Sequence, residues 1–328
     1  MDIQPVRTNE EPLVRRRLTN VFLDYGLFVA LGVLIVVFAL SSPYFFTQQN
    51  LLNIGQSVSV TGIMAAALTV GLIAGQLDLS IGAVLGLSSV VTAISIHDWG
   101  WPSPLGVLAG IAAGVVVGLL NGVLIVNVGI SSIIATLATA LTIAGVSDIL
   151  TSGQAVPITD PTLQAAVNAR PLGIPLPVIL MLVIFAAMYV LLMRTRTGWH
   201  IYAVGGSSSA AIRAGIKTKP LYAGILVLTA VAAAVAGIVS AGRAGSGGPF
   251  FGVNSQFDVL TAVLLGGIGL AGGMGRIERS LAGVALIGVL NNGMTLLSVN
   301  TYIQETVRGG VFILAVVMGA IAAKRTAR

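Results

Sequence analysis

The segment Gly75–Gly82 carries the side chains best suited to hydrogen-bond a polar ligand. It places an amide, a carboxylate and a hydroxyl, from Gln76, Asp78 and Ser80, between two strongly apolar stretches. Glycine stands at both ends and permits an irregular backbone, so the segment predicts a break between two helices. Two compatible interpretations follow. Either the polar groups line a route for a solute, or Asp78 or Ser80 caps the helix that follows.

Catalytic chemistry finds little support in the rest of the sequence. The chain contains no cysteine, which excludes thiolate chemistry, disulfides and cysteine-based metal sites. His97 and His200 are far apart, and no serine has a plausible histidine and acid beside it. Gly267–Gly272 matches G-x-G-x-x-G but lies inside an apolar run, and no G-x-x-x-x-G-K-[ST] occurs. We predict no catalytic residue, no metal and no cofactor on this chain.

The composition indicates a membrane protein. Of the 328 residues 56% are hydrophobic and only 9% are charged, whereas soluble domains average about 25% charged residues. A soluble protein of this size could not cover its surface with so few charges. An irregular backbone at membrane depth must face protein or a cavity, which is compatible both with a solute route beside Asp78 and with a helix cap.

Ten apolar runs are long enough to be transmembrane helices of about 20 residues. They are 22–41, 54–74, 80–97, 104–127, 131–151, 173–193, 220–241, 256–273, 280–298 and 303–322. Helices are favoured over barrel strands because the runs are long and do not alternate with polar residues. The predicted fold is an all-α, polytopic membrane protein with one transmembrane domain, residues 22–322, between terminal segments 1–21 and 323–328.

The basic residues predict how this domain is oriented. All but three of the 17 Lys and Arg residues precede the first run, follow the tenth, or lie between runs six and seven or eight and nine. Ten spans place these four segments on one side, and Arg170, Arg243 and Arg308 on the other. The positive-inside rule then makes both termini cytoplasmic. The net charge of +6 reflects this topology and does not predict a nucleic-acid partner.

The fourth run contains five glycines at intervals of four residues, which strip one helix face of side chains. They are Gly106, Gly110, Gly114, Gly118 and Gly122. Such a face lets another backbone approach closely, and packing within one subunit is the favoured interpretation. Asn121 lies beside the end of this glycine ladder, where its amide could bond a neighbouring helix or a polar solute.

The loop 194–219 is the most informative polar segment. Ser207 is a good N-cap, the residues from Ala210 to Ala214 favour helix, and Gly215 is a natural stop. We predict a short surface helix here. Its small residues suit a groove on a partner protein, but a helix lying on the membrane surface fits the same pattern.

Three motifs in order resemble the permease subunits of bacterial ABC importers for monosaccharides, the ribose, xylose, arabinose and galactose group. Gly75–Gly82 resembles G-G-x-D-L-S-V-G, and Ala203–Ile216 resembles A-x-G-G-N-P-x-A-A-x-x-S-G-I. Asp258–Gly275 resembles D-x-I-A-A-V-x-L-G-G-x-S-L-x-G-G-x-G. Gln76 stands where that family usually has glycine, and Ser207-Ser208 replaces Asn-Pro. The resemblance covers nearly the whole chain.

The resemblance implies a transport subunit of the bacterial plasma membrane and no enzyme. A separate ATPase subunit would hold ATP and Mg and dock on the cytoplasmic loops, an extracytoplasmic binding protein would deliver the sugar, and a second permease subunit would complete the pathway. Asp258, which opens the third motif, joins Gln76, Asp78, Ser80 and Asn121 as a pathway candidate. The residues implied in ATPase coupling are Gly205, Gly206, Ser207, Ala210, Ala211, Arg213 and Gly215.

Two other functions remain open at this point. The chain could serve an ABC importer for another solute, such as a branched-chain amino acid, a nucleoside or a signalling furanone. It could also be a carrier that works without ATP. Ionisable groups are rare within the apolar runs, which disfavours ion coupling. Uptake by the chain alone would identify the carrier.

Overall fold

The computed structural model describes residues 13–326, which form a bundle of thirteen α-helices. Residues 1–12 and 327–328 of the predicted terminal segments lie outside the described part. The helices are α1 (Leu13–Ser41), α2 (Gln48–Ile73), α3 (Ile81–His97), α4 (Ser103–Gly122), α5 (Ser132–Thr151), α6 (Pro161–Asn168), α7 (Leu176–Arg194), α8 (Arg196–Gly206), α9 (Ser208–Arg213), α10 (Thr218–Ala244), α11 (Ser255–Leu265), α12 (Ile277–Leu296) and α13 (Thr301–Thr326).

Five shorter elements complete the described chain. A π-helical turn, η1 (Val123–Val128), continues α4, and 3-10 turns occupy η2 (Pro171–Gly173) and η3 (Pro249–Gly252). Strands β1 (Val156–Pro157) and β2 (Ser246–Gly247) pair antiparallel. This small sheet joins the segment after α5 to the segment after α10.

Six of the described helices are long and apolar enough to cross a membrane, which makes the chain a polytopic membrane protein. They are α2, α4 with η1, α5, α7, α10 and the part of α13 up to Ala320. α2 and α10 are mostly buried, whereas α5, α7 and α13 expose most of their surface. The core of the bundle therefore runs along α2, α3 and α10, with apolar side chains packed on all sides.

One predicted span is shorter than the hydropathy suggests. The run 256–273 forms α11 only as far as Leu265. Its 11 residues rise about 16 Å at 1.5 Å per residue, roughly half of a bilayer core. The helix stops because four glycines between 267 and 275 have positive φ angles, which a right-handed helix excludes. The residues before α11 form the short strand β2 and the turn η3 and pack on α3, where the Ser89 hydroxyl bonds the backbone of Gly248.

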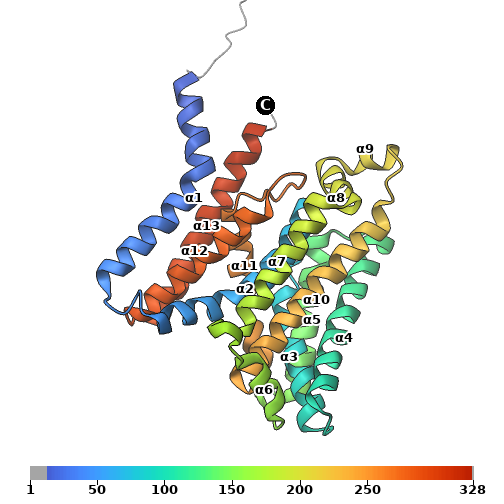
Figure 1. The fold of residues 1–328 in the computed structure, drawn as a ribbon. Coiled ribbons are helices and arrows are strands. Elements are labelled where there is room, and N and C mark those ends of the chain that lie inside the picture. Colours follow the sequence, from blue (N-terminus) through green and yellow to red (C-terminus); the bar gives the residue numbers. More distant parts are fainter. Residues whose placement is uncertain (1–12, 327–328) are drawn as a thin grey trace, which may run out of the picture.

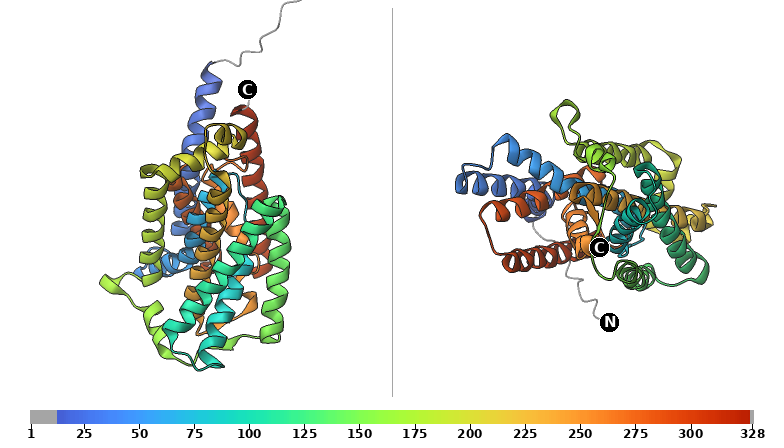
Figure 2. Two further views of the ribbon diagram at one scale, coloured as in Figure 1. Left: turned by 90° about the vertical axis from the view of Figure 1, so that its right-hand side faces the viewer. Right: turned by 90° about the horizontal axis from the view of Figure 1, so that it is seen from below.

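The two described ends of the chain lie at the same end of the bundle. The start of α1, the end of α13 and the helices α8 and α9 gather there, and α6 lies at the opposite end (Figures 1 and 2). The connection between α3 and α4 lies near α6, because the N–H of Ser103 donates to the Asp160 carboxylate at 2.9 Å. The same carboxylate caps α6 by accepting the N–H of Thr162.

Candidate functional site

The carboxylate of Asp78 is buried between α2 and α3 and accepts three hydrogen bonds. Asp78 is 1% exposed. Its Oδ1 accepts the backbone N–H and the hydroxyl of Ser80, at 2.9 and 2.6 Å, and its Oδ2 accepts the hydroxyl of Thr229 on α10 at 2.6 Å. The carboxylate therefore fixes the turn that begins α3 and ties it to α10.

Two further side chains extend these bonds to α4 and α5. The amide of Asn121 on α4 donates to the Ser80 hydroxyl at 3.0 Å. On α5, the Thr136 hydroxyl accepts the backbone N–H of Leu79 at 3.0 Å. We call Asp78, Ser80, Asn121, Thr136 and Thr229 the Asp78 network. It holds the broken segment between α2 and α3 against three other helices.

Two amide oxygens near this network have no partner among the described residues. They are Oε1 of Gln76 and Oδ1 of Asn121, both inaccessible to solvent. An unpaired buried acceptor costs about 1–3 kcal/mol. Each oxygen can accept a hydrogen bond from a hydroxyl group. Because Asp78, Ser80 and Asn121 are buried here, a solute reaches them only when the surrounding helices separate.

The capping interpretation applies to Asp78 and not to Ser80. Ser80 occupies the N-cap position of α3, but its hydroxyl donates to Asp78 and makes no capping bond among the described residues. The Asp78 carboxylate instead accepts the Ser80 N–H. Asp78 thus stabilises the start of α3 from two residues upstream.

Asp258 lies apart from the Asp78 network. It stands in the first turn of α11, and its carboxylate is 3.7 Å from the guanidinium of Arg308 on α13. Arg308 also donates to Asn291 of α12 at 3.0 Å. The structure therefore brings Asp78, Ser80 and Asn121 together, with Gln76 on the same broken segment, and gives Asp258 separate partners.

The predicted surface helix is present as α9. The hydroxyl of Ser207 accepts the N–H of Ala210, and Gly215 ends the segment with a φ of +83°. Ala211 is buried, whereas Ala210, Ile212 and Arg213 are exposed. One face of α9 therefore holds to the bundle, and the other presents an apolar and a basic side chain to the outside.

Helix α8, which sequence reasoning missed, packs its last turn against the end of α2 and leads into α9. A Cβ on Gly205, in its last turn, would overlap the carbonyl oxygen of Ile73 and lie 2.5 Å from the nitrogen of Gly273. A Cβ on Gly272 would lie 3.0 Å from the backbone of Gly75. The N–H of Gly273 donates to the Ile73 carbonyl at 2.8 Å. We call these contacts among Gly75, Gly205, Gly272 and Gly273 the glycine junction.

The glycine junction links the candidate coupling helices to the candidate pathway. Gly75 begins the segment that leads into Asp78, and Gly205 lies in the last turn of α8, which ends at Gly206 shortly before α9. A second bond supports the contact, because the Tyr202 hydroxyl of α8 donates to the carbonyl of Gly275 at 2.9 Å. Close-packed backbone is nearly incompressible, so a displacement of α8 is transmitted to the backbone it contacts.

Comparison with known proteins gives the chain a family. The family model described as "Branched-chain amino acid transport system / permease component" matches residues 50–316. The chain belongs to this family. No solved structure gives a significant match.

Several relatives of this permease-family chain are similar over almost its full length. The ribose import permease protein RbsC of Escherichia coli (strain K12) is 37% identical over 93% of this chain and 96% of its own length. RbsC of Bacillus subtilis (strain 168) is 38% identical over 89% of this chain and 91% of its own. The L-arabinose transport system permease protein AraH of E. coli (strain K12) is 34% identical, covering 90% and 89%.

The glycine ladder of this permease-family chain packs against two helices. A Cβ on Gly106 or Gly110 would press on α3, and a Cβ on Gly114 or Gly118 would press on α10. A Cβ on Gly114, for example, would lie 2.7 Å from the Cβ of Ala234. The ladder thus places α4 close enough for Asn121 to reach Ser80.

Sequence reasoning also missed two members of the Asp78 network, Thr136 and Thr229. Each stands in an apolar helix, where threonine commonly bonds a carbonyl of its own helix. Thr136 donates to the Ser132 carbonyl, and the Thr229 hydroxyl, whose proton goes to Asp78, also lies 3.0 Å from the Leu226 carbonyl. A weak signal was their position as hydroxyl side chains within apolar runs.

Proposed function

We propose that the chain is the membrane-spanning permease subunit of an ATP-driven importer that carries a monosaccharide across the bacterial plasma membrane. The observation that carries this proposal is the similarity to ribose and L-arabinose permeases over about nine-tenths of the chain. The matches run through the segments of the Asp78 network and the glycine junction, so the proposal takes in both the pathway and its coupling.

The proposed topology has ten crossings with both termini in the cytoplasm. It is supported by the position of α8 and α9, which carry basic residues and lie at the same end as the described ends of α1 and α13 (Figure 1). The irregular residues 245–254 and α11 together supply the eighth crossing. An irregular segment at membrane depth is tolerated when it is buried in protein, as the contact with Ser89 provides.

The proposed pathway residues are neutral polar groups around one buried carboxylate. Gln76, Ser80 and Asn121 offer amides and a hydroxyl to an uncharged polyol. Asp78 holds the broken segment in place, and Asp258 forms a separate ion pair with Arg308 between α11 and α13. Few charges near the route suit passage of a sugar without tight binding.

Coupling to ATP is proposed to begin at α9. Its exposed Ile212 and Arg213 would meet the ATPase subunit, which holds ATP and Mg. Displacement of α9 and α8 would pass through Gly205 to the end of α2 and the Asp78 segment. Nucleotide states that bind differently to the permease would then shift the population between its two openings. An extracytoplasmic binding protein and a second permease subunit complete the assembly.

Reconstitution tests the proposal directly. Vesicles that contain this chain, its ATPase and its binding protein should take up labelled monosaccharide only when ATP is supplied. Vesicles with the chain alone should take up none. Uptake by the chain alone would identify an ATP-independent carrier and reject the importer.

A second candidate is an importer of the same kind for a branched-chain amino acid. The description of the matching family favours it. Competition separates the two candidates. Excess unlabelled leucine should leave sugar uptake unchanged if the sugar proposal is correct, and labelled leucine should not enter.

A further inference from the structure

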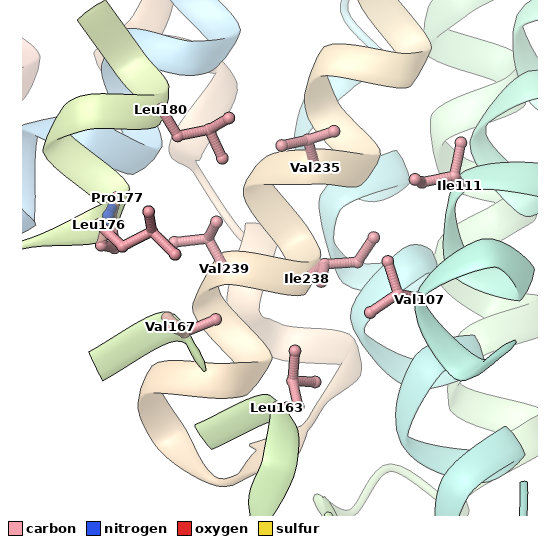
Figure 3. A pocket seen from close by; sticks show the side chains of 10 residues that line it. All are labelled: Val107, Ile111, Leu163, Val167, Leu176, Pro177, Leu180, Val235, Ile238 and Val239. Atoms are coloured by element: carbon pink, nitrogen blue, oxygen red, sulfur yellow. The ribbon is translucent and has the colours of Figure 1, made fainter. Parts of the chain in front are cut away.

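A cavity on the side of the bundle is lined entirely by aliphatic residues. It measures about 250 Å³ and lies between α4, α7 and α10, with α6 across one end (Figure 3). Val107 and Ile111 of α4 face Val235 and Ile238 of α10, while Leu163 and Val167 of α6 lie at its end (Figure 3). We call this cavity the aliphatic groove. It takes no part in the Asp78 network or the glycine junction.

The lining decides what chemistry the groove can hold. A sugar or a peptide backbone would lose hydrogen bonds there without replacement. Water is also disfavoured, because an apolar cavity of about 150 Å³ stays dry and binds apolar molecules instead. A chain of methylene groups meets the lining without loss of any hydrogen bond.

The surroundings of the groove supply such a chain. α7 forms one wall and has the highest mean hydropathy of the six helices able to span a membrane, yet only 22% of its most apolar stretch is buried. A helix of this composition with so much exposed surface faces lipid. The groove therefore opens beside the acyl chains of the bilayer.

The loop between α6 and α7 is suited to the boundary between headgroups and acyl chains. It joins the lining residues Val167 and Leu176 and is closed by the Leu176 N–H, which donates to Ala169 at 2.9 Å. Leu172 at its tip is 98% exposed, and Arg170 stands two residues earlier. An exposed apolar tip beside a cation matches a lipid surface that offers acyl chains below and phosphate above.

We propose that the aliphatic groove binds one acyl chain of a phospholipid whose phosphate pairs with Arg170. α6 closes the groove at the headgroup end. Its own end is held to α4, because the Asp160 carboxylate that caps α6 also accepts the Ser103 N–H at 2.9 Å. The site needs only the membrane-embedded chain, so it stands independently of the transported solute.

Native mass spectrometry of the purified chain tests the site. The wild type should retain one phospholipid after mild detergent removal. Val235→Phe fills the groove from α10 and should lower retention about tenfold, since two buried methylene groups alone are worth that factor. Val183→Phe is the matched control, because Val183 is exposed on α7 outside the groove. It should retain lipid like the wild type, and Arg170→Gln should lower retention.

Several outcomes would overturn the proposal. One is that the wild type retains no phospholipid, and another is that Val235→Phe retains as much as the wild type. A third is that Val235→Phe loses the mass of an oligomer, which would mean that a second copy of the chain occupies the groove. A second measurement, photolabelling, uses the wild-type chain alone. In vesicles of phosphatidylglycerol with a photoactivatable acyl chain, adducts should concentrate at 107–111 and 235–239. An even spread over α7 and α13 would reject the site.

Discussion

Asp78 and Asp258 are both carboxylates set in the helical bundle, but they are held in different ways. Asp78 is 1% exposed and bonds two hydroxyls and a backbone N–H from neighbouring segments. The Asp258 side chain is 24% exposed and faces one guanidinium at 3.7 Å. The first joins helices through short hydrogen bonds, and the second through a partly exposed ion pair.

This difference separates a structural centre from an adjustable contact. A buried acceptor that satisfies three donors cannot leave without stranding them, and each stranded group costs about 1–3 kcal/mol. An accessible ion pair contributes about 0–1 kcal/mol and can break and reform at little cost. We expect the Asp78 segment to move as a unit and the contact between α11 and α13 to open independently.

The largest expected effect follows from Asp78→Ala. It strands the Ser80 N–H and hydroxyl and leaves the Thr229 hydroxyl only the Leu226 carbonyl. We therefore expect a loss of about 3 kcal/mol in stability together with loss of uptake. Thermal unfolding in detergent micelles measures the first effect, and ATP-driven uptake the second. Asp258→Ala is the comparison, with a much smaller shift. Equal shifts for the two variants would remove the distinction between the carboxylates.

Gly205→Ala tests whether the Asp78 segment is connected to α9. The added methyl overlaps the Ile73 carbonyl, and such overpacking costs about 1–3 kcal/mol. We expect lower stability and ATP hydrolysis that no longer drives uptake in the assembled importer. Gly206→Ala is the control, since a Cβ there meets none of the described atoms within 4 Å. If Gly205→Ala leaves ATP-driven uptake unchanged, the proposed connection between α9 and the Asp78 segment is wrong.

Thr229→Val removes one bond of the Asp78 network and leaves the shape of the side chain intact. The net value of a hydrogen bond is about 1 kcal/mol, so we expect a loss of that size in thermal unfolding. Thr261→Val is the matched variant beside Asp258, where the hydroxyl donates to the Phe257 carbonyl of its own helix and, among the described residues, bonds no other group. It should change stability less. A larger loss from Thr261→Val would reverse the comparison.

Arg308→Gln should have the smallest effect. The guanidinium is 37% exposed, so loss of the ion pair is expected to cost less than about 1 kcal/mol. The shorter amide side chain of this variant can still reach toward Asn291. Thermal unfolding of Arg308→Gln and Asp258→Asn, each alone and together, gives the coupling between the pair. A coupling as large as the Asp78→Ala effect would make Asp258 a second structural centre.

The sequence predicted the polar centre of the site but not its partners. Asp78 and Ser80 are conspicuous because they stand in a polar break between two apolar stretches, and Asn121 because it is an amide within an apolar run. Thr136 and Thr229 are not, since a threonine that bonds its own helix looks the same in any apolar run. Which threonine reaches Asp78 depends on how α5 and α10 pack, and that packing depends on contacts between distant segments.

The helices were predicted better than their ends. The run 256–273 reads as one span because glycine, leucine and isoleucine continue past Leu265, and hydropathy does not register a positive φ. Helix α8 was missed because Gly198 and the Gly205-Gly206 pair argue against a helix locally. Its N-cap, in which the Thr195 hydroxyl accepts the Gly198 N–H, is the signal that was available.

Asp160, the cap of α6, has a consequence for acid exposure. The bonds from Thr162 and Ser103 hold the pKa of its carboxyl well below the usual aspartate range. A lowered folded-state pKa stabilises the protein at every pH above the unfolded value of about 3.9, and this contribution is lost only as the pH falls toward the folded-state value. On the face proposed to lie outside the cell, the link between α4 and α6 therefore persists when the medium acidifies during growth.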